Sequence, residues 1–427
     1  EGLMNTFNTQ AYFWSDFVRK FPRVPLLDGP RGLGTVVMPT HIQVGRNAYY
    51  VTDPWRLTKI SEDGTVRTLV GYRHRTPPSY YAGTQDLELV GDWSAIPPER
   101  RGMHEIWGFT WDIFSLAIDP NGPIVNGEPI HLNPPRAFIA DTQNNRVLLL
   151  TFDRASHDTP PKVTEFITGL SDPWDVVWVN GVLYVSERTG HRISAYDGTT
   201  GQFIRNLVSG PDYSGVSTSR FVFRRTSLDL IRQQTVVGPE GLFHQDGWIY
   251  YGSLAMAQVK RVNIATGEVQ LVVNAPTDGN STFIKIALSD GTFGPRGTLF
   301  MSHWSNARHG YPHVFLPDGT PWNILGNGEF NKGAPNTGMG YATAVGVGRG
   351  RMLAGSVSEG LMMLSKTLPT DATFDLTRYR RGHDEYVTRG FRLIYGHGGF
   401  GFYGLPLPWG VSPDVDYYLT LNGHVRP

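Results

Sequence analysis

The stretch Pro173–Gly210, PWDVVWVNGVLYVSERTGHRISAYDGTTGQFIRNLVSG, decides the fold of this chain. An apolar run over 176–179 ends at an Asn-Gly turn, and a second run over 182–185 ends at Ser186–Glu187. Residues 192–196 then alternate, and 197–201 turn the chain into a fourth run over 202–207. Short β-rich runs separated by Gly and Asn turns predict a four-stranded antiparallel meander. Such a meander needs copies of itself to bury both of its faces.

Copies of the same pattern occur along most of the chain. Residues 39–53 and 239–253 match 173–187, and looser copies lie at 138–141, 299–303 and 353–356. The alignment predicts an all-β fold, a six-bladed β-propeller, with blades near 39–71, 112–169, 173–210, 237–275, 281–326 and 340–366. Residues 1–38 are expected to form an N-terminal strap, 39–366 the propeller, and 367–427 a Gly- and aromatic-rich extension. Long insertions are expected at 72–111, 120–135 and 211–236.

Two stretches resemble NHL-type propeller repeats: AFIADTQNNRVLLLTF at 137–152 and LYVSERTGHRISAY at 183–196. The resemblance covers most of 39–366 and implies the fold more than a function, because propellers include both enzymes and binding modules. Residues 173–190 and 297–314 resemble, more weakly, soluble quinoprotein dehydrogenases of the glucose and sorbosone type. The catalytic histidine of that family has no counterpart in its usual context, where Thr235 or Glu240 falls.

The composition limits the classes of partner. The chain of 427 residues has 38 Lys and Arg against 38 Asp and Glu, so no net field attracts nucleic acid. No apolar run reaches the length of about 18 residues that a membrane-spanning helix needs. Cysteine is absent, which excludes disulfides, thiolate metal sites and cysteine nucleophiles. Together with the initial Glu1, which suggests a processed form, this favours a periplasmic or extracellular protein.

The blade alignment places ionisable residues at matching positions. His41, Asp112, Asp175 and Glu240 are expected at the starts of first strands, near the axis, where one imidazole and three carboxylates could hold a divalent cation. The second strands are expected to end at Asp53, Asp141, Glu187, Ser253, His303 and Ser356. The alternative is that carboxylates at the blade ends accept backbone N–H hydrogen bonds in the turn or pair with the basic residue of the loop, which is Arg56, Arg146, Arg192 or Arg261.

Another group of polar and aromatic residues lies at 302–313, SHWSNARHGYPH. His303 is a candidate general base, Trp304 could stack on a sugar or quinone ring, and Arg308 could pair with a carboxylate. In the quinoprotein hypothesis His303 or His41 takes the hydroxyl proton, while Arg308 and Lys285 hold the pyrroloquinoline quinone (PQQ) cofactor. The alternative for this segment is a surface loop with ordinary histidines.

Three hypotheses of function follow. The favoured one is a protein-interaction or assembly module that binds a partner or its own copies through its loops and tail. In the tail, Phe400, Phe402, Tyr403 and Trp409 are the expected interface residues, because aromatic side chains anchor interfaces. The second is a quinoprotein-type sugar or alcohol dehydrogenase. The third is a metal-dependent lyase or lactonase built on the axial acidic cluster.

Overall fold

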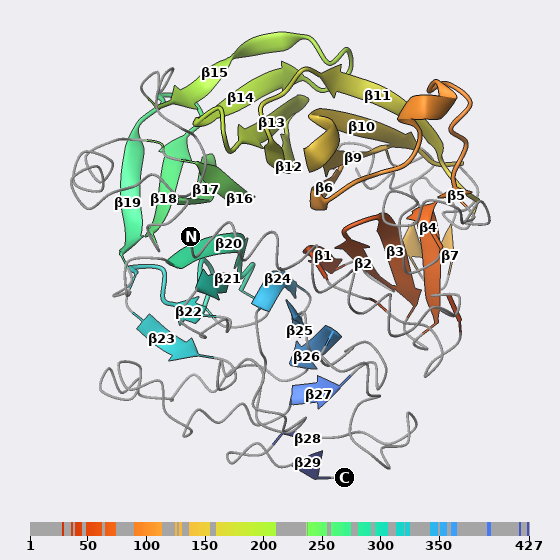
Figure 1. Ribbon diagram of the computed structural model, residues 1–427. Helices are drawn as coiled ribbons and strands as arrows, with labels where there is room; N and C mark the ends of the chain where they lie inside the picture. The colour runs from red at the N-terminus through yellow and green to blue at the C-terminus, as the bar shows by residue number, and fades with distance from the viewer. Residues whose placement is uncertain are drawn as a thin grey trace.

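The computed structural model places β-sheets in a ring around a central axis, and the described residues contain almost no helix (Figure 1). It describes residues 28–29, 36, 39–44, 48–61, 65–73, 89–112, 124–125, 128–129, 136–153, 159–210, 236, 238–253, 258–274, 281–291, 295–305, 313–319, 321–324, 342–348, 351–356, 360–364, 391–393, 418–419 and 425–426. The two helical segments in this part of the chain are 3-10 turns, η2 (Pro98–Arg100) and η4 (Thr142–Asn144).

Five sheets form the blades of a β-propeller, and each runs antiparallel from the axis outward. The first has β1 (His41–Val44), β2 (Ala48–Asp53), β3 (Arg56–Ser61), β4 (Val66–Tyr72) and β5 (Leu89–Val90). The second has β6 (Ile106–Trp111), β9 (Arg136–Asp141), β10 (Arg146–Thr151) and β11 (Lys162–Thr168). The third has β12 (Pro173–Val179), β13 (Val182–Glu187), β14 (Arg192–Asp197) and β15 (Phe203–Ser209).

The fourth and fifth blades repeat this order. The fourth has β16 (Pro239–Gln245), β17 (Trp248–Ser253), β18 (Gln258–Asn263) and β19 (Val269–Asn274). The fifth has β20 (Ser281–Leu288), β21 (Leu299–Ser305), β22 (His313–Phe315) and β23 (Pro321–Ile324). A two-stranded sheet, β7 (Ile124–Val125) with β8 (Glu128–Pro129), lies between β6 and β9 in the sequence.

The remaining sheet does not have the plain four-stranded form. It joins β24 (Ala342–Gly348), β25 (Arg351–Ser356) and β26 (Gly360–Leu364) to three further short strands. These are β27 (Phe391–Leu393), β28 (Tyr418–Leu419) and β29 (Val425–Arg426), which come from the predicted extension. The structure therefore confirms an all-β propeller with five blades, and the expected six blades are not confirmed.

The start of the second blade differs from the prediction. The structure places the innermost strand at β6, inside the segment expected to be an insertion, and not at residue 112. The sequence of β6, IWGFTW, is buried at every position, so it lacks the polar alternation that marks a half-exposed strand. It is also separated from its partner β9 by residues 112–135, whereas most hairpin partners are close in sequence.

Similar tight turns connect neighbouring strands in more than one blade, and they fix the register of the strand pairs. Asn180 and Gly181 between β12 and β13 both have positive φ, as do Asp246 and Gly247 between β16 and β17. Both residues of a two-residue hairpin need positive φ when the turn must match the strand twist, which explains Asn-Gly and Asp-Gly. The outer turns are alike too, since Gly201 donates to the Asp197 carbonyl and Gly267 to the Asn263 carbonyl.

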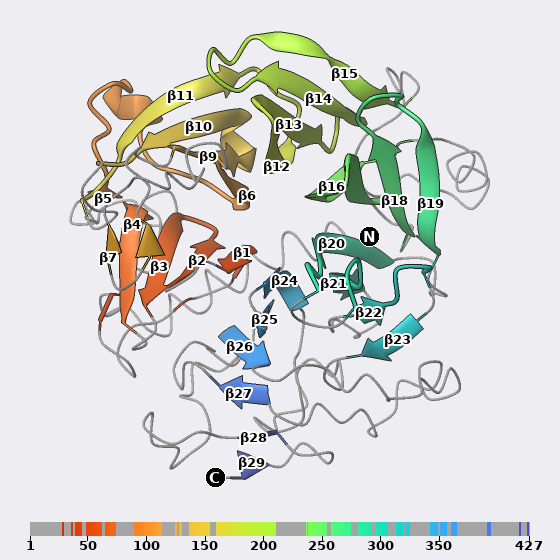
Figure 2. The same cartoon turned by 180° about the vertical axis from the view of Figure 1, so that it is seen from behind.

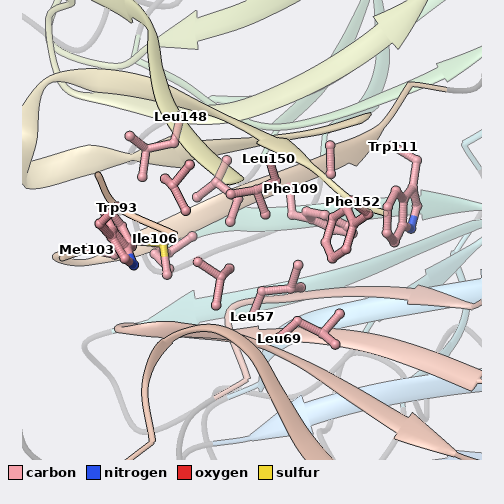
Figure 3. Packing of buried hydrophobic residues seen from close by; sticks show 14 of the residues in the cluster. Leu57, Leu69, Trp93, Met103, Ile106, Phe109, Trp111, Leu148, Leu150 and Phe152 are labelled. Carbon is pink, nitrogen blue, oxygen red and sulfur yellow. The ribbon is translucent and has the colours of Figure 1, made fainter. Parts of the chain in front are cut away.

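Apolar side chains from neighbouring sheets pack together and form the core. Leu57 and Leu69 of the first blade meet Phe109, Leu148 and other side chains of the second (Figure 3). Similar clusters join the second blade to the third, the third to the fourth, and the fourth to the fifth. A further one joins β24 and β25 to the first blade. Each blade therefore buries its faces against its neighbours, as a propeller requires.

The innermost strands contact one another in a closed order around the axis (Figure 2). β1 contacts β6, and the contacts continue through β12, β16, β20 and β24 back to β1. Some of these approaches allow no side chain. A Cβ atom added to Gly108 of β6 would lie 2.5 Å from the Asp175 Cα and 2.9 Å from the Trp174 carbonyl oxygen.

We expect Gly108→Ala to lower the free energy of unfolding by about 1–3 kcal/mol, because the overlap is with backbone atoms of β12 that cannot move alone. Gly348→Ala in β24 is the matched control, since an added Cβ there meets no atom closer than 3.6 Å. The control should be neutral or stabilising by about 0.4–1 kcal/mol. Denaturant unfolding of both variants measures the difference, and equal stabilities would contradict this account of the inner ring.

Candidate functional site at the propeller axis

The six innermost strands have one structurally equivalent position, which is defined by the pairing of each with the second strand of its sheet. In five of the strands this residue pairs with, or lies beside, the residue just before the end of the second strand, and in β20 it pairs with Ser302 of β21. The equivalent residues, in chain order, are His41, Gly108, Asp175, Gly241, Lys285 and Ala344. Ionisable and small residues therefore alternate around the ring.

The small residues let the strands approach closely beside the charged ones. A Cβ on Gly241 would lie 2.4 Å from the Ile284 carbonyl oxygen and 2.7 Å from the Lys285 Cα. The same constraint at Gly108 brings β6 against Asp175. The glycines of the second and fourth blades thus allow the inner strands to approach closely. The ionisable side chains of the first, third and fifth blades can then contact one another.

His41, Asp175 and Lys285 meet at the axis, and we call them the axial triad. The Lys285 Nζ donates to Asp175 Oδ2 at 2.7 Å, and His41 Nδ1 lies 3.6 Å from Asp175 Oδ1. The backbone N–H groups of Val176 and Leu242 also donate to the Asp175 carboxylate, each at 2.9 Å. Both oxygens of the carboxylate are therefore held by contacts from its own third blade and from the first, fourth and fifth blades.

The axial triad is almost completely removed from water. The exposed fractions of the side chains are 0% for Asp175, 2% for Lys285 and 13% for His41. Burial raises the pKa of the Asp175 carboxyl and lowers the pKa of the Lys285 ammonium. Burial and the positive charge of Lys285 hold the pKa of His41 well below its ordinary value. His41 is thus the most exposed member and is uncharged near neutral pH.

A second cluster, the tryptophan stack, is formed by Trp107 and Trp174, which directly precede Gly108 and Asp175 in the sequence. The rings of Trp107 and Trp174 stack with centroids 4.4 Å apart, and the Arg188 guanidinium lies 4.0 Å from the Trp174 ring centroid. Arg188 also donates to Asp172 at 2.6 Å and lies 3.7 Å from Glu240 Oε1. Glu240 therefore faces an arginine of the third blade.

The predicted metal group is not assembled. His41 and Asp175 are brought together, but Glu240 pairs with Arg188, and Asp112 follows the far end of β6, where it accepts hydrogen bonds from Arg136 at 2.8 and 3.0 Å. The placement of Asp112 was wrong because β6 ends, rather than begins, beside it. Within the described ranges, no group of three or more metal-ligating side chains occurs.

Five of the six second strands end at the predicted residue, whereas β21 extends past His303 to Ser305. Asp53, Asp141 and Glu187 end β2, β9 and β13, and each pairs with the arginine directly opposite on the next strand. The distances are 2.7 Å for Arg56, 2.8 Å for Arg146 and 2.7 Å for Arg192. The alternative of carboxylate–arginine pairing is therefore confirmed in three blades. Arg261 differs, because it binds Gln270 and stacks on Trp248.

Several predicted residues lie outside this description. Arg308 and the interface residues Phe400, Phe402, Tyr403 and Trp409 fall outside the described residues. His303 and Trp304 belong to β21, where His303 pairs with Phe283, but their side chains are not among those described. Lys285, expected to hold a cofactor, donates a hydrogen bond to Asp175.

Sequence reasoning missed two features of the site. The Asp175–Lys285 contact joins residues 110 positions apart, and no local pattern signals it. Trp107 was placed in an insertion, although its equivalence to Trp174 becomes visible once IWG at 106–108 is aligned with PWD at 173–175. The signal that could have identified β6 as an inner strand is a Trp two residues before an apolar residue, as in Trp107 with Phe109 and Trp174 with Val176.

The fold and this site define the class as a β-propeller, and comparisons with known proteins go no further. No protein-family model and no curated protein matches the chain. Solved structures that it resembles include a nidogen/laminin complex (10% identity, TM-score 0.43, 74% of this chain and 88% of that chain). Others are a streptogramin B lyase (13%, 0.41, 78% and 94%) and a computationally designed protein (10%, 0.40, 93% and 98%).

We expect His41 to make stability depend on pH. An unfolded imidazole takes up a proton near its ordinary pKa of 6.5, whereas folded His41 does so only at lower pH. Between these values the unfolded chain binds more protons. The contribution of His41 is therefore full above about pH 6.5 and is lost as pH falls toward the folded pKa.

The measurement is the free energy of unfolding at about pH 7.5 and pH 5, compared between the wild type and His41→Gln. The wild type should lose more stability on acidification than the variant. The comparison cancels His191 and His244, whose pKa values are also lowered by burial. An equal loss in both proteins would show that His41 takes up its proton normally in the folded state.

Proposed function

We propose that this chain is a propeller with six blades that binds a small polar molecule at its axis and exchanges protons with it through His41, Asp175 and Lys285. The sixth blade would be the sheet that begins with β24. Its support is that β24 contacts β20 on one side and β1 on the other, which closes the ring.

The observation that carries the proposal is the alternation of ionisable and small residues at the six equivalent inner positions. A buried ion pair contributes little to stability compared with well-packed apolar side chains, so packing alone gives no reason for it. Ionisable groups whose pKa values are shifted by burial and by a specific partner are instead common at functional sites. Gly108, Gly241 and Ala344 at the other three equivalent positions show that the fold does not require a charged residue there.

The roles follow from the contacts. His41 directs Nδ1 toward Asp175, so Nε2 is the ring nitrogen left for a ligand. A neutral imidazole can accept a proton from a ligand hydroxyl, and the Asp175 carboxylate stabilises the imidazolium that results. Lys285 balances the charge of Asp175 and is the available cation for a ligand oxygen. The triad therefore suits general acid–base chemistry on a small molecule with hydroxyl or carbonyl groups.

The proposal is tested by NMR of protein labelled at its 13 histidines, with dihydroxyacetone and glycerol as the probes. We expect the His41 ring signals, identified by their loss in His41→Gln, to shift on titration. Asp175→Asn should weaken this binding by about tenfold or more, since it removes the contact that orients the imidazole.

Lys260→Met is the control, because Lys260 is buried in β18, which is not an inner strand. This variant should bind both probes as the wild type does. Should neither probe move the His41 signals, or should Asp175→Asn bind both as the wild type does, the axial site has no such function.

Assembly is a second candidate function, and a specific observation favours it. Phe203 and Ile204 on β15 are 58% and 49% exposed, and Leu271 on β19 is 55% exposed. These large apolar side chains lie on the outermost strands of adjacent blades. A second copy of the chain would remove them from water, and apolar side chains on the outer edge of a sheet are typical association sites.

We expect Phe203→Ser with Ile204→Ser to shift the protein toward monomer in light scattering coupled to size-exclusion chromatography. The reason is that each side chain loses about 1.5–3 kcal/mol of burial in the interface. Gln202→Ser, at an exposed polar neighbour, is the control and should leave the mass unchanged. A wild type that is monomeric at every concentration would exclude this function.

A further inference from the structure

Lys285 has the surroundings of a reactive amine as well as of an ion-pair partner. Its Nζ is 2.7 Å from Asp175 Oδ2, and only 2% of its side chain is exposed. Desolvation favours the uncharged amine, which is the nucleophilic form. The carboxylate beside it can accept the proton that the ammonium must lose.

The second oxygen of the same carboxylate connects Lys285 to His41. Asp175 Oδ1 lies 3.6 Å from His41 Nδ1, and among the described residues this nitrogen makes no hydrogen bond. The three groups come from the first, third and fifth blades, so a proton can pass between an amine and an imidazole through one carboxylate. A lysine that served only to neutralise Asp175 would not need the imidazole on the other oxygen.

We propose that Lys285 captures small carbonyl compounds as an imine, with Asp175 and His41 moving the protons. This rests on the proposed function, because the carbonyl compound must first bind at the axis. The Nζ lone pair forms a C–N bond as the carbonyl π bond breaks and its oxygen takes a proton. The carbinolamine then loses that oxygen as water, which leaves the C=N bond to Lys285. One amine and one carbonyl give one imine and one water, and no oxidant or reductant takes part.

The ligand class follows from the burial of the triad. Because the side chains of Asp175 and Lys285 are 0% and 2% exposed, the proposed ligand is a molecule of a few heavy atoms. A hydroxyl next to the carbonyl would place a proton donor against His41, the most exposed member. The structure therefore assigns small hydroxycarbonyl compounds as the substrates of this site.

The test is reductive trapping of the full chain by dihydroxyacetone with cyanoborohydride near neutral pH, followed by peptide mapping. Two other lysines are internal controls in the same sample. Lys162 on β11 is exposed, and Lys260 on β18 is buried with a pKa lowered by burial. We expect the adduct on Lys285 to form about tenfold faster or more than on either control.

Asp175→Asn tests the proton transfer separately from the amine. We expect it to slow adduct formation at Lys285 by about a hundredfold, the usual scale of general acid–base assistance, with labelling of Lys162 unchanged. Lys285→Arg keeps a cation beside Asp175 and should lose the selective adduct. Glycerol, which lacks a carbonyl, should shift the His41 signals without any adduct.

Two outcomes separate this inference from the proposed function. If dihydroxyacetone shifts the His41 signals but labelling follows exposure, with Lys162 modified first and Lys285 unmodified, the imine is excluded and the binding site stands. If neither the His41 signals nor Lys285 responds, both are excluded. Selective labelling of Lys285 that survives Asp175→Asn at full rate would overturn the role given to the carboxylate.

Discussion

The structure depends on the packing of one sheet face against the next around a closed ring. A four-stranded antiparallel sheet here has two apolar faces and only a thin edge, so it cannot be stable alone. The clusters that join neighbouring blades, such as Leu57 and Leu69 against Phe109, supply the missing surfaces. Because every blade depends on both neighbours, the ring must close, and closure brings the innermost strands together at the axis.

Closure at the axis creates the conditions for the candidate site. Backbones of neighbouring inner strands come so near that Gly108 and Gly241 have no room for a side chain. In the same ring His41, Asp175 and Lys285 are forced out of water and onto one another. Their pKa values shift because burial penalises charge, and the ion pair only partly compensates. The chemistry proposed for the site is thus a consequence of the close approach of the inner strands, which buries the three ionisable side chains.

Other polar groups in the structure have an evident structural use, which sets the axial triad apart. Arg56, Arg146 and Arg192 each tie the end of a second strand to the strand beside it through a carboxylate. These pairs join strands of one blade, at matching positions of the repeat. The Asp175–Lys285 pair instead joins the inner strands of the third and fifth blades, through residues that are 110 positions apart. A pair that recurs at matching positions of the repeat indicates a role in the fold. The Asp175–Lys285 pair does not recur in this way, which indicates a role in function.

The sequence by itself determined the propeller class, five of the blades and the ends of five of the six second strands. Those features come from local signals: Asn-Gly and Asp-Gly turns, apolar runs and a repeating spacing. It placed His41 and Asp175 near the axis for the same reason. It did not place β6, whose buried run shows no polar alternation, and so it put Asp112 at the wrong end of a strand. Only the tertiary structure decided that Lys285 meets Asp175 and that Glu240 faces Arg188. Contacts between residues of different blades are set by ring closure, and no periodicity along one strand encodes them.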